Sequence, residues 1–84
     1  MGRRNFGLSQ GLLLKDTNSI HTFFVFLPID VVFLDSEMKV VRTVASLKPF
    51  SISPIVWKAK SVLELPVGTI KTQEIKVGKQ INLV

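Results

Sequence analysis

The sequence predicts an all-β domain, a small β-sandwich or flattened barrel with one short helix near residues 69–75. Three observations support this fold class. Residues 20–26 and 29–34 are rich in Ile, Val and Phe, which are typical of strands. Further short β-rich runs follow at roughly even spacing, separated by Pro, Gly, Asp and Ser. No long segment shows the 3.6-residue apolar period of an amphipathic helix.

The most apolar stretch of the chain runs from Ser19 to Asp35 and is divided by Pro28. Proline cannot donate to a β-ladder, so Pro28 is expected at a break or an edge bend between strands 20–26 and 29–34. Strand 29–34 carries apolar residues on both of its alternating faces, which predicts that it is covered on both sides. Residues 35–38 favour a turn, and residues 39–45 are again β-rich. The sequence therefore predicts an antiparallel hairpin of 29–34 with 39–45.

The second half of the chain alternates between expected strands and loops. Residues 46–53 contain Pro49 and are expected to form an irregular crossing loop. Residues 55–60 are expected to form a short strand with Trp57 pointing inward, because a small domain needs its aromatic side chains for its core. A further strand is expected over 61–65, closed by Pro66, Val67 and Gly68.

The last part of the chain predicts one or two helical turns and a final strand. Thr69 is a residue type that favours the helix N-cap, and Ile70 and Ile75 would face the core while Glu74 points outward. A turn containing Gly78 then leads into an expected strand over residues 80–84.

Length and composition limit the protein to few classes. Eighty-four residues predict a single domain over residues 1–84, with residues 1–6 as a flexible arm. There is no cysteine, so disulfides and thiolate metal sites are excluded, and a cytoplasmic location is the expectation. The apolar run is too short and too interrupted for a membrane span. The net charge of +5 comes from scattered residues, which favours a solubilising surface over specific nucleic-acid recognition.

An ordered set of short motifs resembles a known family. The motifs are an apolar strand entering Pro-hydrophobic-Asp, then Phe-Leu-Asp, a Lys-Pro loop, Leu-Glu-Leu-Pro-x-Gly and a late Gly turn. They correspond to Pro28–Asp30, Phe33–Asp35, Lys48–Pro49, Leu63–Gly68 and Gly78. The chain is similar in these positions to the prokaryotic family named domain of unknown function 192. The resemblance implies a jelly-roll type of sandwich and no established activity.

Candidate functional residues come from polar groups placed among apolar ones. Asp30 follows Pro28 and is flanked by apolar residues, so burial would make it either a structural acceptor of backbone N–H groups or an acid or base. His21 and Thr22 begin the same apolar run, and Lys48 and Trp57 are expected at the rim of a site there. Glu64 alternates with Leu63 and Leu65 and is expected to point into solvent. No spacing indicates a metal site, and no catalytic residue or cofactor is assigned.

These residues support three classes of function. The leading hypothesis is a non-enzymatic binding module for a small molecule or a protein, with a shallow cleft beside His21 and Asp30. The alternative is an acid–base enzyme in which Asp30 and His21 converge. A weak nucleic-acid binder would need Lys and Arg gathered on one face beside an exposed Trp57. The expected assembly is a monomer or a small homo-oligomer.

Overall fold

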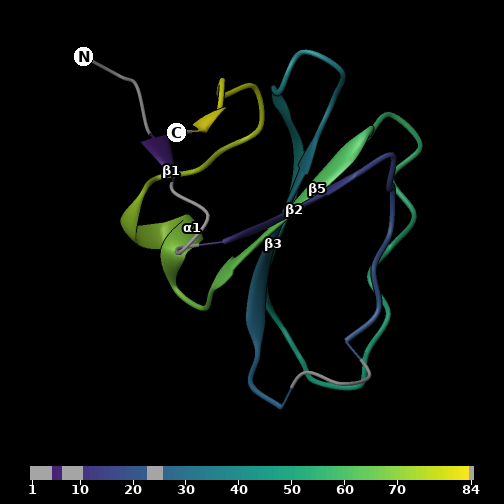
Figure 1. Ribbon diagram of the computed structural model, residues 1–84. Helices are drawn as coiled ribbons and strands as arrows, with labels where there is room; N and C mark the ends of the chain where they lie inside the picture. The colour runs from purple at the N-terminus through teal and green to yellow at the C-terminus, as the bar shows by residue number, and fades with distance from the viewer. Residues whose placement is uncertain (1–4, 7–10, 23–25, 84) are drawn as a thin grey trace.

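The computed structural model describes residues 5–6, 11–22 and 26–83. Its centre is a four-stranded antiparallel sheet with the strand order β2-β5-β3-β4. The strands are β2 (Leu12–Lys15), β3 (Ile29–Leu34), β4 (Val40–Leu47) and β5 (Ser61–Pro66). One short helix, α1 (Thr69–Thr72), lies on one side of the sheet, and irregular chain lies on the other (Figure 1). The predicted all-β fold with a short helix is confirmed.

The predicted hairpin is formed by β3 and β4, which pair antiparallel with Val32 opposite Thr43. Asp35 closes its turn. Its carboxylate oxygen Oδ1 accepts the backbone N–H groups of Glu37 at 2.8 Å and of Lys39 at 2.9 Å. The bond from Lys39, with the one from Glu37, holds the pKa of Asp35 below its usual value. An aspartate that bonds its own turn is the local signal that made this hairpin predictable.

Strand β3 is the buried centre of the fold, as its apolar pattern predicts. Val32 and Leu34 pack in one cluster with Leu63, Leu65 and Ile75, on the side of the sheet where α1 lies. Val31 and Phe33 pack in a second cluster on the opposite side of the sheet, with Ile20, Ala59 and Val62. Successive side chains of a strand point to opposite faces, so β3 supplies both clusters. We call the two sides the helix face and the covered face.

The covered face is closed by two irregular segments, residues 16–22 and 48–60, that run alongside each other (Figure 1). The N–H of Thr22 donates to the carbonyl of Ser51 at 2.8 Å, and the N–H of Val56 donates to the carbonyl of Asn18 at 2.9 Å. His21 and Ile52 form an isolated antiparallel bridge. These bonds hold the two segments together as one layer, which we call the covering layer.

The covering layer replaces two strands that the sequence predicted. Residues 55–60 contain no strand, and of the predicted strand 20–26 only His21 makes a β-bridge, while residues 23–25 lie outside the described residues. Trp57 is 79% exposed, so its expected place in the core is wrong. It occupies a turn in which the Ala59 N–H donates to the Val56 carbonyl at 2.9 Å. Of the described phenylalanines with known burial, Phe33 is buried, whereas Phe26 and Phe50 are exposed.

Strand β2 was not predicted, because its Leu-Leu-Leu-Lys sequence lacks β-branched residues. It pairs antiparallel with β5, with Leu13 opposite Leu63. The preceding Gly11 permits the close approach of the two strands. A Cβ atom at this position would lie 2.7 Å from the Leu65 side chain and 2.8 Å from the Glu64 carbonyl.

The end of the chain matches the prediction in outline. Ile70 packs against the helix-face cluster, Ile75 is buried and Glu74 is exposed. Thr69 does not cap the helix as predicted. Gly68 is the N-cap, and the Thr69 hydroxyl donates to the Pro66 carbonyl at 2.6 Å. The final strand is shorter than predicted: β6 (Asn82–Leu83) pairs in parallel with β1 (Asn5–Phe6).

Candidate functional site

Asp30 is buried on the helix face, at 1% exposure, where both carboxylate oxygens accept backbone hydrogen bonds. The Ser46 N–H donates to Oδ1 at 2.9 Å, and the Ile70 N–H donates to Oδ2 at 2.8 Å. The first bond lies beside an irregularity in the β3–β4 pairing, and the second anchors α1 to the sheet. The predicted burial and backbone bonding of Asp30 are confirmed. The carboxylate joins three elements and is committed to the structure.

Thr22 is likewise a structural group. Its side chain is almost fully buried, and its hydroxyl donates to the Lys48 carbonyl at 2.7 Å while accepting the Ser51 N–H at 2.8 Å. The hydroxyl therefore pins residues 48–51 to the segment that contains Thr22. Lys48 takes part in this contact through its backbone, and the residue itself is exposed.

The structure does not bring His21 and Asp30 together. Asp30 points to the helix face, in phase with Val32 and Leu34, and bonds to α1. His21 is exposed and belongs to the covering layer on the other side of the sheet. A converging acid–base pair of these two residues, required by the predicted enzyme alternative, is contradicted by their placement on opposite faces.

Glu64 points to the face opposite that of Leu63 and Leu65, as the predicted alternation requires, but it does not point into open solvent. It lies on β5 opposite Val31 and Leu12, and it is partly buried on the covered face rather than fully solvated. Burial raises the pKa of Glu64, and the nearby positive charge of His21 lowers it in part. In the sequence, the residue that indicates the partial burial of Glu64 is Val62. It is two residues before Glu64, so it shares the same face, and it is an apolar residue that needs cover.

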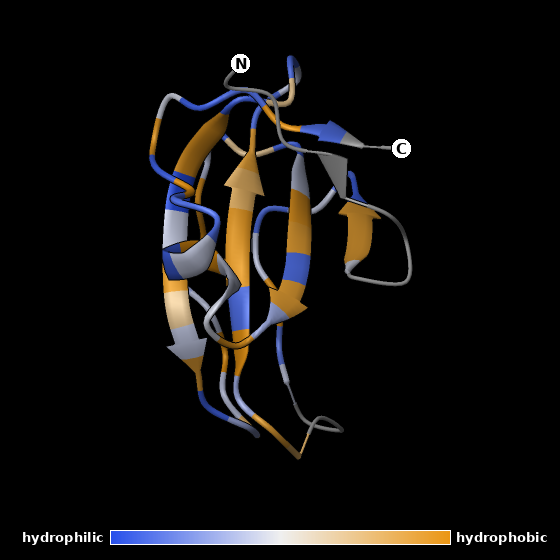
Figure 2. Cartoon of the chain, turned by 90° about the vertical axis from the view of Figure 1, so that its left-hand side faces the viewer, coloured by the Kyte–Doolittle hydropathy of each residue, from blue (hydrophilic) through white to orange (hydrophobic). Residues whose placement is uncertain are grey.

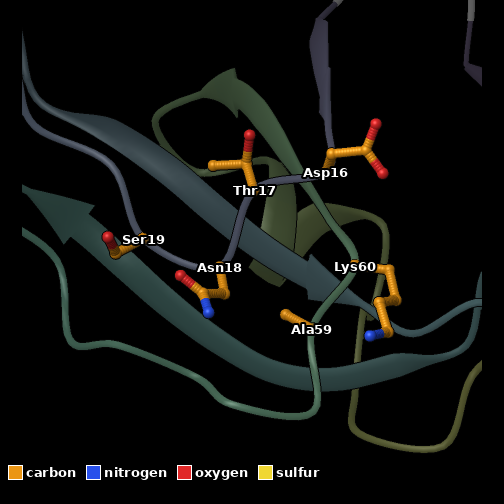
Figure 3. Close-up of a pocket in the computed structure, with 6 residues that line it drawn as sticks. All are labelled: Asp16, Thr17, Asn18, Ser19, Ala59 and Lys60. Atoms are coloured by element: carbon orange, nitrogen blue, oxygen red, sulfur yellow. The ribbon is translucent and has the colours of Figure 1, made fainter.

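A polar hollow of about 440 Å³ lies where the two segments of the covering layer meet β5 (Figure 3). Its lining consists of Asp16, Thr17, Asn18, Ser19, Ala59 and Lys60. The Thr17 N–H donates to the Lys60 carbonyl at 3.1 Å, which joins the two sides of the hollow. None of the five residues predicted for the site lines this hollow, although Trp57 occupies the turn that precedes Ala59.

The hollow combines several kinds of polar group. The lining carries one carboxylate, one ammonium, one amide and two hydroxyls, together with the methyl group of Ala59. Within the described part of the chain, the side chains of Asp16, Asn18, Ser19 and Lys60 make no hydrogen bond or ion pair with one another or with other described residues. Their donors and acceptors are therefore available to a ligand. No sequence motif indicates this site, because its two sides are about forty residues apart in the chain.

The described residues contain neither a cluster of metal ligands nor a membrane-spanning helix. Over residues 5–6, 11–22 and 26–83, no three His, Asp or Glu side chains gather in a way that could hold a metal ion. No helix in this part of the chain has the length and apolar character needed to span a bilayer.

Comparison with known proteins gives a consistent family. A family model for DUF192, described as "Uncharacterized ACR", matches residues 1–83. A UPF0127 protein of Pyrococcus abyssi is 42% identical over 66 residues, which cover 79% of this chain and 56% of that protein. A UPF0127 protein of Pyrococcus horikoshii is 40% identical over 64 residues, covering 76% of this chain and 55% of the relative. The chain therefore spans about half the length of these relatives.

The fold also matches a solved structure. The crystal structure of a protein of unknown function from Novosphingobium aromaticivorans has a TM-score of 0.72 with this chain, at 22% sequence identity. The match covers 83% of this chain and 54% of that protein, and at this identity it supports the fold alone. The match of the family model over nearly the whole sequence, together with the archaeal relatives, shows that this chain belongs to the DUF192 family of uncharacterised proteins.

Proposed function

We propose that this domain is a non-enzymatic binding module, and that its ligand is a small polyhydroxylated molecule such as a sugar ring. The observation that carries the proposal is the hollow between residues 16–19 and 59–60. It holds side chains with unused donors and acceptors, and its volume of about 440 Å³ falls in the usual range for small-molecule sites. The site differs from the one predicted beside His21 and Asp30.

The chemistry of the hollow fits a neutral ligand with many hydroxyl groups. A sugar hydroxyl both donates and accepts, so it can pair with the Asp16 carboxylate, the Asn18 amide and the Lys60 ammonium in different orientations. A purely anionic ligand would be repelled by Asp16, and a cation would be repelled by Lys60. The mixed charges of the lining therefore favour a ligand without strong net charge.

Trp57 supplies the second element of a sugar site. Its turn is joined to Asn18 through the Val56 N–H bond and leads directly into Ala59, so Trp57 lies two residues before a residue of the lining, and its side chain is exposed. An indole offers a flat apolar surface and one N–H donor, which suits the C–H face of a sugar ring. The one tryptophan of the chain is 79% exposed, so its indole is open to a ligand.

The proposal is tested by nuclear magnetic resonance titration with glucose, galactose, N-acetylglucosamine and ribose, with glycine as a zwitterionic comparison. We expect the amide signals of residues 16–19 and 59–60, and the single indole N–H signal, to shift with at least one sugar. Asn18→Ala should weaken binding roughly fivefold through one lost hydrogen bond. Trp57→Ala should weaken it by a similar factor or more.

The control variant is Val77→Ala, which removes part of another exposed apolar side chain in the turn that contains Gly78. It should bind sugar as the parent does. Shifts confined to other regions, no shift with any sugar, or equal binding by Asn18→Ala and Val77→Ala would contradict the proposal. A response to glycine alone would identify a zwitterion site instead.

One observation favours a second function. Trp57 is exposed and is followed by the exposed residues Lys58 and Lys60, which is the basic–aromatic arrangement that weak single-strand binding requires. The other basic residues remain scattered along the sequence, and we retain the prediction that there is no specific nucleic-acid recognition. Electrophoretic shift with single-stranded DNA at near-physiological salt should show no complex. A stable complex there, lost in Trp57→Ala, would favour the second function.

A further inference from the structure

Met38 places a sulfur atom at the boundary between solvent and the helix-face cluster. The chain has no cysteine and two methionines, Met1 and Met38. Met38 lies in the turn between β3 and β4, where it is partly exposed and packs against the helix-face cluster. A solute can therefore reach this residue, and a chemical change in its side chain is felt by the core on that face.

The turn holds the backbone of Met38 in an unfavourable conformation. Its φ of 64° lies in the left-handed region, which residues with a Cβ atom rarely adopt. The Met38 N–H donates to the Asp35 carbonyl at 3.0 Å. The N–H groups of the two flanking residues, Glu37 and Lys39, donate to the carboxylate of the same aspartate. Such a conformation persists because surrounding contacts hold it, and the packing of the Met38 side chain is one of them.

Met38 also connects this turn to residues 79–83, which we call the C-terminal segment. The Ile81 N–H donates to the Met38 carbonyl at 2.9 Å, and Ile81 is buried in the cluster against which Met38 packs. The Gln80 side-chain amide donates to the Glu37 carbonyl at 2.6 Å, and Gln80 forms an isolated antiparallel bridge with Lys39. The chain after α1 thus runs beside the turn on its way to the C-terminus (Figures 1 and 2).

We propose that Met38 is a site of oxidation by peroxides, and that its oxidation loosens the C-terminal segment from the turn. In the reaction with hydrogen peroxide, the Met38 sulfur attacks one peroxide oxygen, the O–O bond breaks and an S–O bond forms. The thioether is oxidised to a sulfoxide, and the peroxide is reduced to one water molecule that carries away both of its hydrogen atoms. The reaction needs no group other than the sulfur and the peroxide.

Oxidation weakens the contact because it makes the side chain polar. A thioether packs readily on apolar neighbours, whereas a sulfoxide oxygen requires a hydrogen-bond donor. The helix-face cluster consists of apolar side chains, so the oxidised side chain is better solvated outside it. Loss of this packing lets the strained turn relax and weakens the hold on Ile81. Methionine sulfoxide can be reduced enzymatically, which makes the change reversible.

The test is to treat the folded protein with hydrogen peroxide, to locate the added oxygen by peptide mass mapping, and to follow amide hydrogen exchange by magnetic resonance. We expect one oxygen atom on Met38 and exchange of the Ile81 N–H that is faster by at least about tenfold, because this amide is released by local opening. The amides of β3 should change much less. Met38→Gln, which places a polar side chain in the same position, should accelerate Ile81 exchange without peroxide.

Met38→Leu is the matched control, because leucine has a similar volume and cannot take up oxygen. Its Ile81 amide should not respond to peroxide, although Met1 and Trp57 are still present. Trp57→Phe keeps Met38 and should respond as the parent does. Thermal unfolding before treatment checks that every variant is folded.

Four outcomes would overturn the proposal. Met38 could stay unoxidised in the folded protein under conditions that oxidise free methionine. Oxidation of Met38 could leave Ile81 exchange unchanged, or it could accelerate the amides of β3 to the same extent, which would indicate global destabilisation. Finally, Met38→Leu could respond to peroxide as the parent does, which would assign the response to another residue.

Discussion

The two faces of the central sheet use their polar groups in opposite ways. On the helix face, Asp30 is buried and both of its oxygens accept backbone hydrogen bonds. On the covered face, Glu64 is partly buried and burial raises its pKa, and the covering layer contains a polar hollow. Asp30 and Glu64 lie on adjacent strands, one register position apart. The face toward which a carboxylate points therefore decides whether backbone donors hold it in place.

The difference follows from what covers each face. Helix α1 and the residues after it bring apolar side chains and one aligned N–H group to the helix face. The covered face is closed by irregular backbone, which needs side-chain hydroxyls such as Thr22 and Ser53 to satisfy its polar groups. Irregular cover also leaves hollows and exposes apolar side chains. The candidate site belongs to this layer for that reason.

Among the polar side chains, the largest effect on stability is expected from breaking the brace on the helix face. Asp30→Ala leaves the Ser46 and Ile70 N–H groups without their acceptor and should lower the free energy of unfolding by roughly 1–3 kcal/mol. Urea denaturation measures the loss. Glu74→Ala, at an exposed position, should change it by less than about 0.5 kcal/mol. Equal stability of the two variants would show that the Asp30 carboxylate does not brace the helix face.

A somewhat smaller effect is expected within the covering layer. Thr22→Val keeps the shape of the side chain but removes the hydroxyl that bonds Lys48 and Ser51, at a cost of about 1–2 kcal/mol. Thr72→Val, at an exposed threonine of α1, is the matched control and should have little effect. Amide exchange of residues 50–53 should accelerate in Thr22→Val only. Unchanged exchange there would show that backbone bonds alone hold the layer.

A smaller effect on stability is expected from the titration of Glu64, and it tests how the covered face acts on a carboxylate. Its pKa is raised in the folded state by burial, so the folded state binds the proton more tightly than the unfolded chain does. Stability should therefore fall as the pH rises from below the unfolded value of 4.5 through the folded pKa. Glu64→Gln should abolish this step and stabilise the protein at neutral pH by less than about 1 kcal/mol.

His21 provides an internal check on that titration. Its positive charge lowers the pKa of Glu64, so His21→Ala should move the carboxyl titration to higher pH in a carbon-detected magnetic resonance experiment. A shift to lower pH, or a Glu64 that titrates as in a model peptide, would show that the covered face does not perturb its carboxylate.

The smallest stability effect is expected at Trp57. Because its side chain is mostly exposed, Trp57→Ala should change the free energy of unfolding by less than about 0.5 kcal/mol while affecting the proposed ligand binding. Phe33→Ala, in the covered-face cluster, is the opposite case and should cost about 3–5 kcal/mol. A large loss of stability in Trp57→Ala would show that Trp57 contributes to the core, as the sequence predicts.

Local sequence determined the central hairpin and the burial and hydrogen bonding of Asp30. The β-rich run with apolar residues on both faces predicts a strand covered twice, and Asp35 predicts the turn through bonds to its own backbone. A carboxylate inside such a run must find donors, so its burial and bonding could be expected before its partners were known. These properties depend on residues within a few positions of one another.

Only the tertiary structure decided which groups meet. Residues 16–19 and 59–60 form one hollow although the chain between them crosses the sheet, and no pattern in either segment indicates the other. Alternation predicts that neighbouring residues of a strand point to opposite faces, but it does not predict which segment covers each face. The sequence therefore suggested a pair of His21 with Asp30, whereas in the structure Asp30 bonds to α1 and the charge of His21 acts on Glu64. Trp57 seemed to belong to the core by composition, yet a four-residue turn holds it in solvent. Strand patterns are local, whereas sites arise from the packing of distant segments, and packing is a property of the folded chain as a whole.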